Sequence, residues 1–187
     1  MKTKDFRLFK GHQKMNILIR QEIETDFSDV FELNKAAFAQ DVEGKLVNEL
    51  RKSNAFIPEL SLVATLDKKI IGHNLFTKIK IKNDSGNEYN SLALAPIAVA
   101  PEFQKQGIGS QLIKQGLALS KRLGHQSVIV LGHEHYYPKF GFVPAANWNI
   151  KAPFDVPSNV FMGIELKENG LKNVRGTVQY PREFNLA

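Results

Sequence analysis

Two glycines near the middle of the chain stand where a phosphate group can be held. Gly107 and Gly109 follow an apolar run at residues 92–100 and precede a segment with helical spacing, and Lys105 lies just before them. Glycine lets the chain bend and lets a ligand approach the backbone closely. The first N–H groups of a helix have no partner within it and lie at its positive end, so they bind anions. The pattern predicts a phosphate site, and an ordinary strand-to-helix turn is the alternative.

The spacing of these glycines excludes two common nucleotide-binding motifs. Leu112 stands where the dinucleotide-binding motif has its third glycine, and no Gly-Lys-Ser/Thr follows as in a P-loop. A helix is expected from Gln111, because apolar residues recur at helical spacing from there to Leu123.

Pro96 interrupts the apolar run that precedes the glycines. Proline has no N–H to give to a neighbouring strand, so a proline inside a strand marks a sheet edge or a bulge. We therefore expect the strand to be locally broken at residues 95–97.

Two short stretches resemble the markers of the GNAT acetyltransferase superfamily. Residues 104–109 (QKQGIG) resemble its Gln/Arg-x-x-Gly-x-Gly/Ala signature, which likewise lies between a bulged strand and a helix. Tyr137, four residues before Gly141 and the phenylalanine that follows it, is similar to the second marker. The string at residues 131–137 is similar to the YhbS-type branch, in which an acidic residue more usually stands at the position of His133.

The resemblance covers residues 15–184 and implies an α/β fold, the GNAT-like acyl-CoA N-acyltransferase fold. This fold has a mixed, mostly antiparallel central sheet, splayed between its fourth and fifth strands, with helices on both faces. The resemblance also implies acetyl-CoA as co-substrate in the splayed seam. The backbone of Ile97 and Val99 is then expected to hold the pantetheine arm, and an N–H of Ile97 or Ala98 to polarise the thioester carbonyl. The pyrophosphate is expected on the N–H groups of Gln104, Lys105, Gln106, Gly107, Ile108, Gly109 and Ser110.

Tyr137 matches the general-acid position of the family. The thiolate that leaves when the thioester is cleaved needs a proton, and a phenol with a pKa of about 10 is close enough to a thiol's ~8.5 to supply one. Tyr136, the residue before it, is expected to point elsewhere on a helical turn. The alternative for Tyr137 is a tyrosine packed at a helix–sheet junction with its hydroxyl bonded to backbone.

A protonated amine cannot attack a thioester, so a base or a relay of water molecules is expected. Some family members use a glutamate on the fourth strand, but residues 92–99 contain no acid. Glu43 is the tentative base, because it stands in a predicted helix break that lines the acceptor site in the family. Asp41, His73 and His133 are the alternatives, and all four are also compatible with ordinary surface or satisfied polar residues.

Length and composition predict one domain. The 187 residues, 43% of them hydrophobic, are enough for one buried core and few for two. Residues 15–187 are expected to form a single N-acetyltransferase domain after a basic tail at residues 1–14, which is flexible or forms an added turn. No segment is apolar enough to span a membrane, and the tail lacks the apolar stretch of a secretory signal. The absence of cysteine excludes disulfides and fits a cytoplasmic protein.

The formal charge of +6 favours an anionic ligand, such as a phosphate-rich cofactor or nucleic acid. No block of like charge stands out, however, so we interpret the charge as lysines spread over the surface, and nucleic acid is not expected as a partner. The string His133-Glu134-His135 lacks the His-Glu-x-x-His spacing that places two imidazoles on one helical face, so no metal site is predicted.

Apolar patterns predict the elements that position these groups. Strands are expected at residues 16–21, 60–66, 70–82, 89–99, 127–131 and 159–166, with hairpin turns at residues 67–69 and 83–87. Two helices are expected within residues 27–53, separated by a break at residues 38–44. The alternation after residue 171 is typical of an edge strand, which can pair with a second copy of the chain, so a homodimer is one expectation.

Together these features predict an acetyl-CoA-dependent N-acetyltransferase that acetylates a primary amine of a small molecule or peptide by direct attack. A non-catalytic module that binds acetyl-CoA is the alternative, and a nucleic-acid-binding protein, suggested only by the charge, is the third hypothesis. The sequence carries no readable code for the acceptor, although Trp148 and Phe154 are candidates for its entrance.

Overall fold

A computed structural model describes residues 4–10 and 13–186 of the chain. The sheet has the strand order β1-β2-β3-β4-β5-β6-β9-β7, with β10 paired to β4 and β8 paired to β10. The strands are β1 (Lys4–Lys10), β2 (Gln13–Gln21), β3 (Ser61–Leu66), β4 (Lys69–Lys82), β5 (Glu88–Val99), β6 (Ser127–Leu131), β7 (Val143–Pro144), β8 (Ile150–Lys151), β9 (Phe161–Glu165) and β10 (Gly176–Gln179). The helices are α1 (Phe27–Phe38), α2 (Val42–Arg51) and α3 (Ile108–Arg122), and the short 3-10 turns that matter below are η4 (Tyr137–Phe140) and η6 (Arg182–Leu186).

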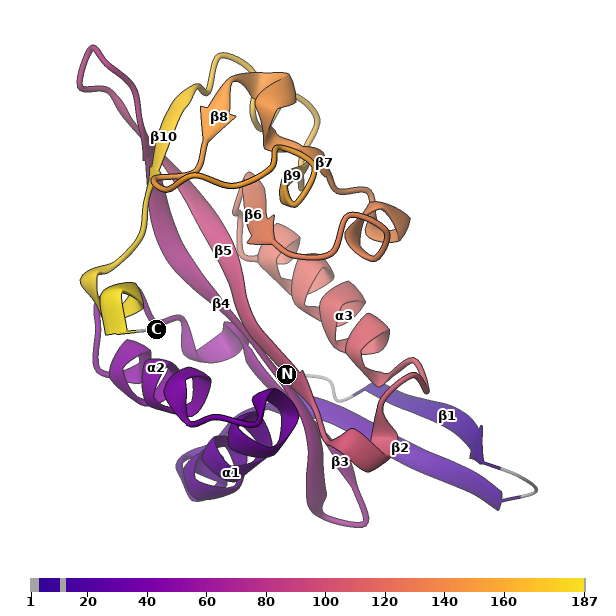
Figure 1. The fold of residues 1–187 in the computed structure, drawn as a ribbon. Helices are drawn as coiled ribbons and strands as arrows, with labels where there is room; N and C mark the ends of the chain where they lie inside the picture. The colour runs from indigo at the N-terminus through magenta and orange to yellow at the C-terminus, as the bar shows by residue number, and fades with distance from the viewer. Residues whose placement is uncertain (1–3, 11–12, 187) are drawn as a thin grey trace.

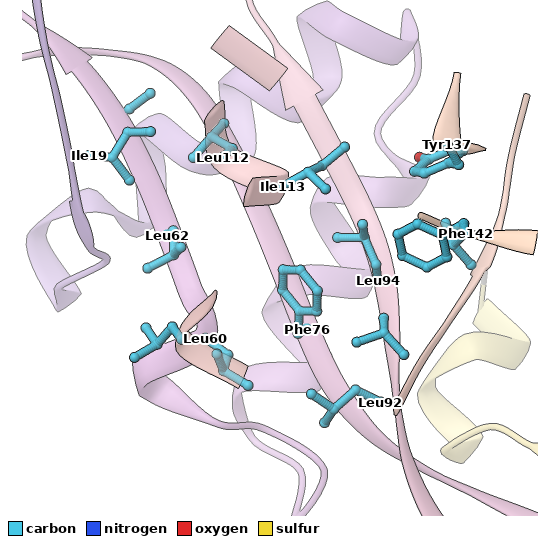
Figure 2. Close-up of a cluster of buried hydrophobic side chains, with 14 of the residues drawn as sticks. Ile19, Leu60, Leu62, Phe76, Leu92, Leu94, Leu112, Ile113, Tyr137 and Phe142 are labelled. Carbon is cyan, nitrogen blue, oxygen red and sulfur yellow. The ribbon is translucent and has the colours of Figure 1, made fainter. Parts of the chain in front are cut away.

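Helices cover both faces of this sheet (Figure 1). On one face α1 and α2 bury an apolar stripe, in which Val47 packs in one cluster with Leu75 of β4. On the other face α3 buries Leu112 in the cluster that contains Phe76 and Leu94, as Figure 2 shows. The predicted mixed sheet between helical layers is therefore confirmed, and β4 and β5 are held rigidly between two apolar cores.

The sheet opens between β5 and β6. These strands are parallel and pair only where Leu92 faces Val128 and Ala93 faces Ile129. Both strands continue beyond the last pair, β5 as far as Val99. Beyond that point, the backbone N–H and C=O groups on the facing edges of β5 and β6 therefore do not bond to each other.

A bulge in β5 lies just past the last pair. Asn74 of β4 faces Ile97 and Phe76 faces Leu94, so that Leu75 alone stands opposite Ala95 and Pro96. The break predicted from Pro96 is confirmed. One extra residue in one strand bends that strand and increases its twist, which turns β5 away from β6.

The helix after the glycines begins earlier than its apolar spacing predicted. α3 starts at Ile108 rather than Gln111. Gly107 is its N-cap with a φ of 86°, a left-handed conformation that glycine adopts without steric cost. The earlier start brings Gly109 and Ser110 into the first turn of the helix, where N–H groups are unpartnered.

The two ends of the chain differ most from the predicted elements. The range set apart as a tail contains β1, which pairs with β2; residues 1–3 and 11–12 lie outside the described residues. Near the other end, β10 pairs with β4 on one side and with β8 on the other. The sheet edge on which the expected homodimer depended is therefore occupied by strands of the same chain.

A buried polar network ties α2 to the sheet on the face opposite α3. Arg51 of α2 forms an ion pair with Glu22, and Ser61 donates to the same carboxylate at 2.7 Å. His73 Nε2 lies 3.1 Å from the Ser61 Oγ, and its Nδ1 has no partner. Burial, with a smaller contribution from the positive charge of Arg51, lowers the pKa of His73 from 6.5 to about 3.

This histidine predicts a loss of stability in acid. Below pH 6.5 the unfolded chain binds a proton at His73, whereas the folded chain does not until the pH approaches its folded-state pKa of about 3. The free energy of unfolding therefore falls on acidification through this window, with a contribution of about 1.4 kcal/mol per pH unit from this residue. We expect His73→Gln, which keeps a donor for Ser61, to reduce that slope in denaturant titrations at several pH values. The exposed His135 provides the control His135→Gln, and equal slopes for wild type and His73→Gln contradict the assignment.

Candidate active site

A cleft of about 1150 Å³ lies where β5 and β6 separate. Its floor is the β5 segment from Ala93 to Val99 and the β6 segment from Ile129 to Leu131. Residues of α1 and α2 line it from one face of the sheet, and the start of α3 lines it from the other. One cleft therefore reaches both faces through the open seam, which gives two reactants separate routes to the same backbone.

The alternation of the β4–β5 ladder decides which backbone groups face the seam. The Ala100 N–H donates to the Ile71 oxygen at 3.0 Å. In an antiparallel pair, positions that are hydrogen-bonded across the ladder alternate with positions that are not. The backbone N–H and C=O of Ala98 therefore point at its partner His73 on β4. The N–H and C=O groups of Ile97 and Val99 consequently point away from β4 and toward the cleft.

Of the predicted carbonyl-polarising groups, this geometry brings the Ile97 N–H to the seam. Ala98 does line the cleft, but its N–H is directed into the ladder. The Val99 oxygen, on the seam side, accepts a bond from the Gln104 side chain at 3.1 Å. Gln104, the first residue of the glycine signature, thus links the end of β5 to the turn that follows it.

The start of α3 closes one end of the cleft. Its first helical bond runs from the Gln111 N–H to the Gly107 oxygen at 3.1 Å. The N–H groups of the three residues between these two have no carbonyl four positions back within the helix. A Cβ at Gly109 would lie 3.6 Å from the Val99 side chain and 3.7 Å from that of Ile97, so glycine keeps this corner open.

The remaining residues of the predicted phosphate loop do not line the cleft with their side chains. Lys105 is exposed with a left-handed φ of 59°, and the Gln106 amide donates to the Glu102 oxygen at 3.0 Å. Ile108 is buried in the core beneath α3, and Ser110 turns its hydroxyl toward Tyr136. Any contact of these residues with a phosphate has to come from their backbone.

Tyr137 lines the cleft from η4. Its ring lies against Gly132, where a Cβ would approach a ring carbon to 2.2 Å, and it meets Phe142 edge to face with 5.7 Å between ring centroids. Figure 2 shows the two rings together at the edge of the core. Burial, with a smaller contribution from Tyr136, raises the pKa of Tyr137 to about 12. The phenol is thus protonated throughout the neutral range.

Tyr136 also lines the cleft, which the expected helical geometry of this segment did not anticipate. Its hydroxyl lies 3.4 Å from the Ser110 Oγ, and a Cβ at Gly109 would lie 3.1 Å from it. The two tyrosines therefore face different parts of one cleft, Tyr136 the first turn of α3 and Tyr137 the seam. Their rings are perpendicular, with centroids 5.2 Å apart.

The structure separates the four candidate bases. Glu43 lies in the first turn of α2 rather than in the helix break, and it lines the cleft. Its Oε1 accepts from Gln40 at 2.9 Å, whereas its buried Oε2 has no partner. His133 also lines the cleft. Asp41 pairs with Lys45 at 2.7 Å outside it, and His73 is in the buried network described above.

The last third of the chain supplies cleft residues that had no recognisable motif. They are Pro153, Phe154, Val178, Gln179, Tyr180, Phe184 and Asn185. In the sequence they lie in loops, a short strand and a turn without catalytic spacing, so only the loop aromatic Phe154 offered a signal. Trp148, the other aromatic predicted for the entrance, packs instead in the core around Ile129 and Val178.

No helix among residues 4–10 and 13–186 has the length and apolar character to cross a membrane. Within the same residues, no three histidine, cysteine, aspartate or glutamate side chains gather as a metal site does. His133 lines the cleft while the His135 side chain is 93% exposed, so the two imidazoles of this string do not converge.

The chain is similar to known proteins over most of its length. A family profile described as an acetyltransferase (GNAT) domain matches residues 58–144. The uncharacterized N-acetyltransferase YhbS of Escherichia coli is 32% identical over 170 residues, which cover 90% of this chain and 99% of YhbS. The uncharacterized N-acetyltransferase YjhQ of the same organism is 38% identical over 135 residues, 72% of this chain and 74% of YjhQ.

Solved structures give the same result. The crystal structure of YhbS from Escherichia coli in complex with CoA superposes with a TM-score of 0.85 and 30% identity, covering 95% of this chain and 96% of that one. A GNAT family acetyltransferase from Brucella melitensis in complex with acetyl-CoA gives a TM-score of 0.74 and 29% identity, covering 90% and 97%. The fold implied by the two short markers is confirmed, and the chain belongs to the GNAT family of N-acetyltransferases.

Proposed function

We propose that the protein transfers an acetyl group from acetyl-CoA to a primary amine of a small molecule or peptide. The observation that carries this proposal is the convergence of three features on one cleft. Backbone groups of Ile97 and Val99 face an open seam, unpartnered N–H groups begin α3 beside it, and the protonated Tyr137 lies on its wall. The solved relatives in complex with CoA and acetyl-CoA support the choice of donor.

The residues present fit a CoA thioester. A pantetheine arm carries amide groups, and the seam-facing N–H and C=O groups of Ile97 and Val99 can bond to them as a neighbouring strand would. A pyrophosphate carries negative charge, which the first N–H groups of α3 and the positive end of its dipole stabilise. When bound, acetyl-CoA supplies an acetyl group already activated as a thioester.

The chain's own residues then serve the transfer in three ways. The Ile97 N–H polarises the carbonyl oxygen by donating a hydrogen bond. The amine forms a C–N bond as the C–S bond breaks, and the amine proton leaves toward Glu43, directly or through water. Tyr137 donates its phenolic proton to the departing sulfur and regains one from the medium. One acetyl group moves, and the products are the amide and the free thiol of CoA.

An acceptor screen with thiol detection tests this function. Purified protein is mixed with acetyl-CoA and one amine at a time, and CoA release is followed with a thiol reagent while calorimetry measures acetyl-CoA binding. We expect both binding and amine-dependent thiol release. Binding without release from any amine supports the non-catalytic module instead, and absence of binding overturns the proposal altogether.

Gly109 provides a specific test of the cofactor end. We expect Gly109→Val to weaken acetyl-CoA binding about tenfold or more in calorimetry, because the new side chain occupies the corner between Val99, Ile97 and the Tyr136 hydroxyl. Ala118→Val is the matched control, since it places the same side chain at an exposed position of the same helix. Equal affinities of the two variants contradict the location of the cofactor.

A further inference from the structure

Three aromatic rings form a continuous wall on the side of the cleft away from α3. The rings of Phe154 and Tyr180 are stacked, with centroids 6.3 Å apart and planes at 12°. The ring of Tyr180 also packs on that of Phe184, with 4.9 Å between their centroids. All three line the cleft. They come from the loop between β8 and β9, the residue after β10, and η6, which lies beside α2 in Figure 1.

The wall has exposed apolar surface that the fold does not use. Phe154 is 48% exposed, and Phe38 at the end of α1, which also lines the cleft, is 39% exposed. Large aromatic side chains are costly to leave in water, and apolar surface inside a cleft is typical of a ligand site. This surface lies on the α1 and α2 side of the sheet, whereas the N–H groups expected to hold phosphate lie on the α3 side.

Glu43 is the one Asp, Glu, Lys or Arg among the described residues that line the cleft. Its Oε2 is buried without a hydrogen-bond partner, and a buried carboxylate oxygen is costly unless a donor or a cation reaches it. The ammonium form of an amine in the cleft becomes such a partner when the Glu43 side chain turns this oxygen toward it. No Lys or Arg side chain of the described part of the cleft wall can pair with a second, anionic group on the same molecule.

We infer that the acceptor is a small monoamine with an aromatic or similarly apolar body and without a carboxylate. The inference rests on the proposed function and names the substrate class of the same site. The ammonium binds at Glu43 and loses its proton there, and the apolar body lies against Phe38 and the ring wall of Phe154, Tyr180 and Phe184. The free amine then forms the C–N bond to the acetyl carbon as CoA leaves with the proton from Tyr137.

The inference distinguishes amines that differ by one feature. Phenethylamine has both features, ethylamine lacks the ring, phenylalanine adds a carboxylate, and putrescine replaces the ring by a second ammonium. We expect kcat/KM for phenethylamine to exceed that of each of the other three by about tenfold or more, because burial of a ring stabilises binding and an unpaired charge in the cleft opposes it. The measurement is thiol release at saturating acetyl-CoA.

Two variants test whether the ring wall causes the preference for phenethylamine over ethylamine. We expect Phe154→Ala to raise KM for phenethylamine about tenfold and to leave kcat/KM for ethylamine within about twofold. Val143→Ala is the control, because Val143 is also exposed and apolar but does not line the cleft. A thermal melt of each variant verifies that it is folded.

The outcomes separate this inference from the proposed function. Thiol release that is equal or faster with ethylamine, phenylalanine or putrescine overturns the acceptor class and leaves the acetyltransferase intact. Equal loss on phenethylamine and ethylamine in Phe154→Ala also overturns it, because the ring wall then serves stability alone. If acetyl-CoA binds but no amine releases thiol, the proposed function fails and the acceptor class with it.

Discussion

Replacement of Tyr137 by phenylalanine is expected to lower kcat for amine acetylation by about 10²- to 10⁴-fold, the usual contribution of a positioned general acid. Affinity for acetyl-CoA should stay within about twofold, because the ring that packs on Gly132 and Phe142 is retained. The loss is expected in kcat, since in the proposed mechanism the lost proton transfer occurs only as the C–S bond breaks. Steady-state kinetics with thiol detection and calorimetry on the same preparations give the two values.

Tyr136→Phe is the matched control for this prediction. It removes a hydroxyl one residue away that faces Ser110 and Gly109 instead of the seam. We expect it to change acetyl-CoA affinity modestly and kcat by less than about tenfold. If Tyr136→Phe costs more in kcat than Tyr137→Phe, the acid has been assigned to the wrong tyrosine.

The pH profile offers a second check on the same residue. Because burial raises the pKa of Tyr137 to about 12, the phenol keeps its proton well above the point where an ordinary tyrosine, with a pKa of 10.0, begins to lose it. The rate should therefore show no alkaline decline from this group near pH 10. A decline there that disappears in Tyr137→Phe contradicts the buried environment of the acid.

Gly132→Ala is expected to have the second-largest effect on activity. The backbone at Gly132 does not have a positive φ, so alanine fits the chain itself. Its Cβ would, however, lie 2.2 Å from a ring carbon of Tyr137, and the ring has to move by about 1 Å, a displacement that costs on the order of 10²-fold in rate at a reacting centre. Steady-state kinetics measure the loss, and acetyl-CoA affinity should change little.

A double substitution shows whether this loss acts through Tyr137. In a Tyr137→Phe background, Gly132→Ala should cost little more, because the hydroxyl that it displaces is already absent. If Gly132→Ala lowers kcat by the same factor in both backgrounds, Gly132 affects the rate by a route other than Tyr137.

The bulge in β5, the glycine turn and β6 were the most predictable parts of the structure. Pro96 indicated a bulge because proline lacks the N–H that a ladder needs, and the bulge lies at that residue. The glycine turn indicated a helix start, although α3 begins three residues before Gln111, because Gly107 can cap the helix in a left-handed conformation that apolar spacing does not reveal. The strand at Ser127–Leu131 matched its prediction throughout.

Side-chain neighbours were less predictable. Tyr136 was expected to point away from the site, yet both tyrosines line the cleft, because η4 is a short turn rather than a helix with regular spacing. Glu43 and Asp41 stand two residues apart and look alike in sequence. In the structure Asp41 pairs with Lys45, while Glu43 directs an unpartnered oxygen into a buried position of the cleft wall.

The family, the bulge and the glycine turn were readable in the amino-acid sequence, since each depends on a few adjacent residues. The side chains that face the seam across from them could be identified only in the folded chain. The ring wall brings Phe154, Tyr180 and Phe184 together with Glu43, more than a hundred positions earlier in the chain. Such contacts depend on how β10 and η6 fold back over the sheet, and no local preference of these residues specifies that path.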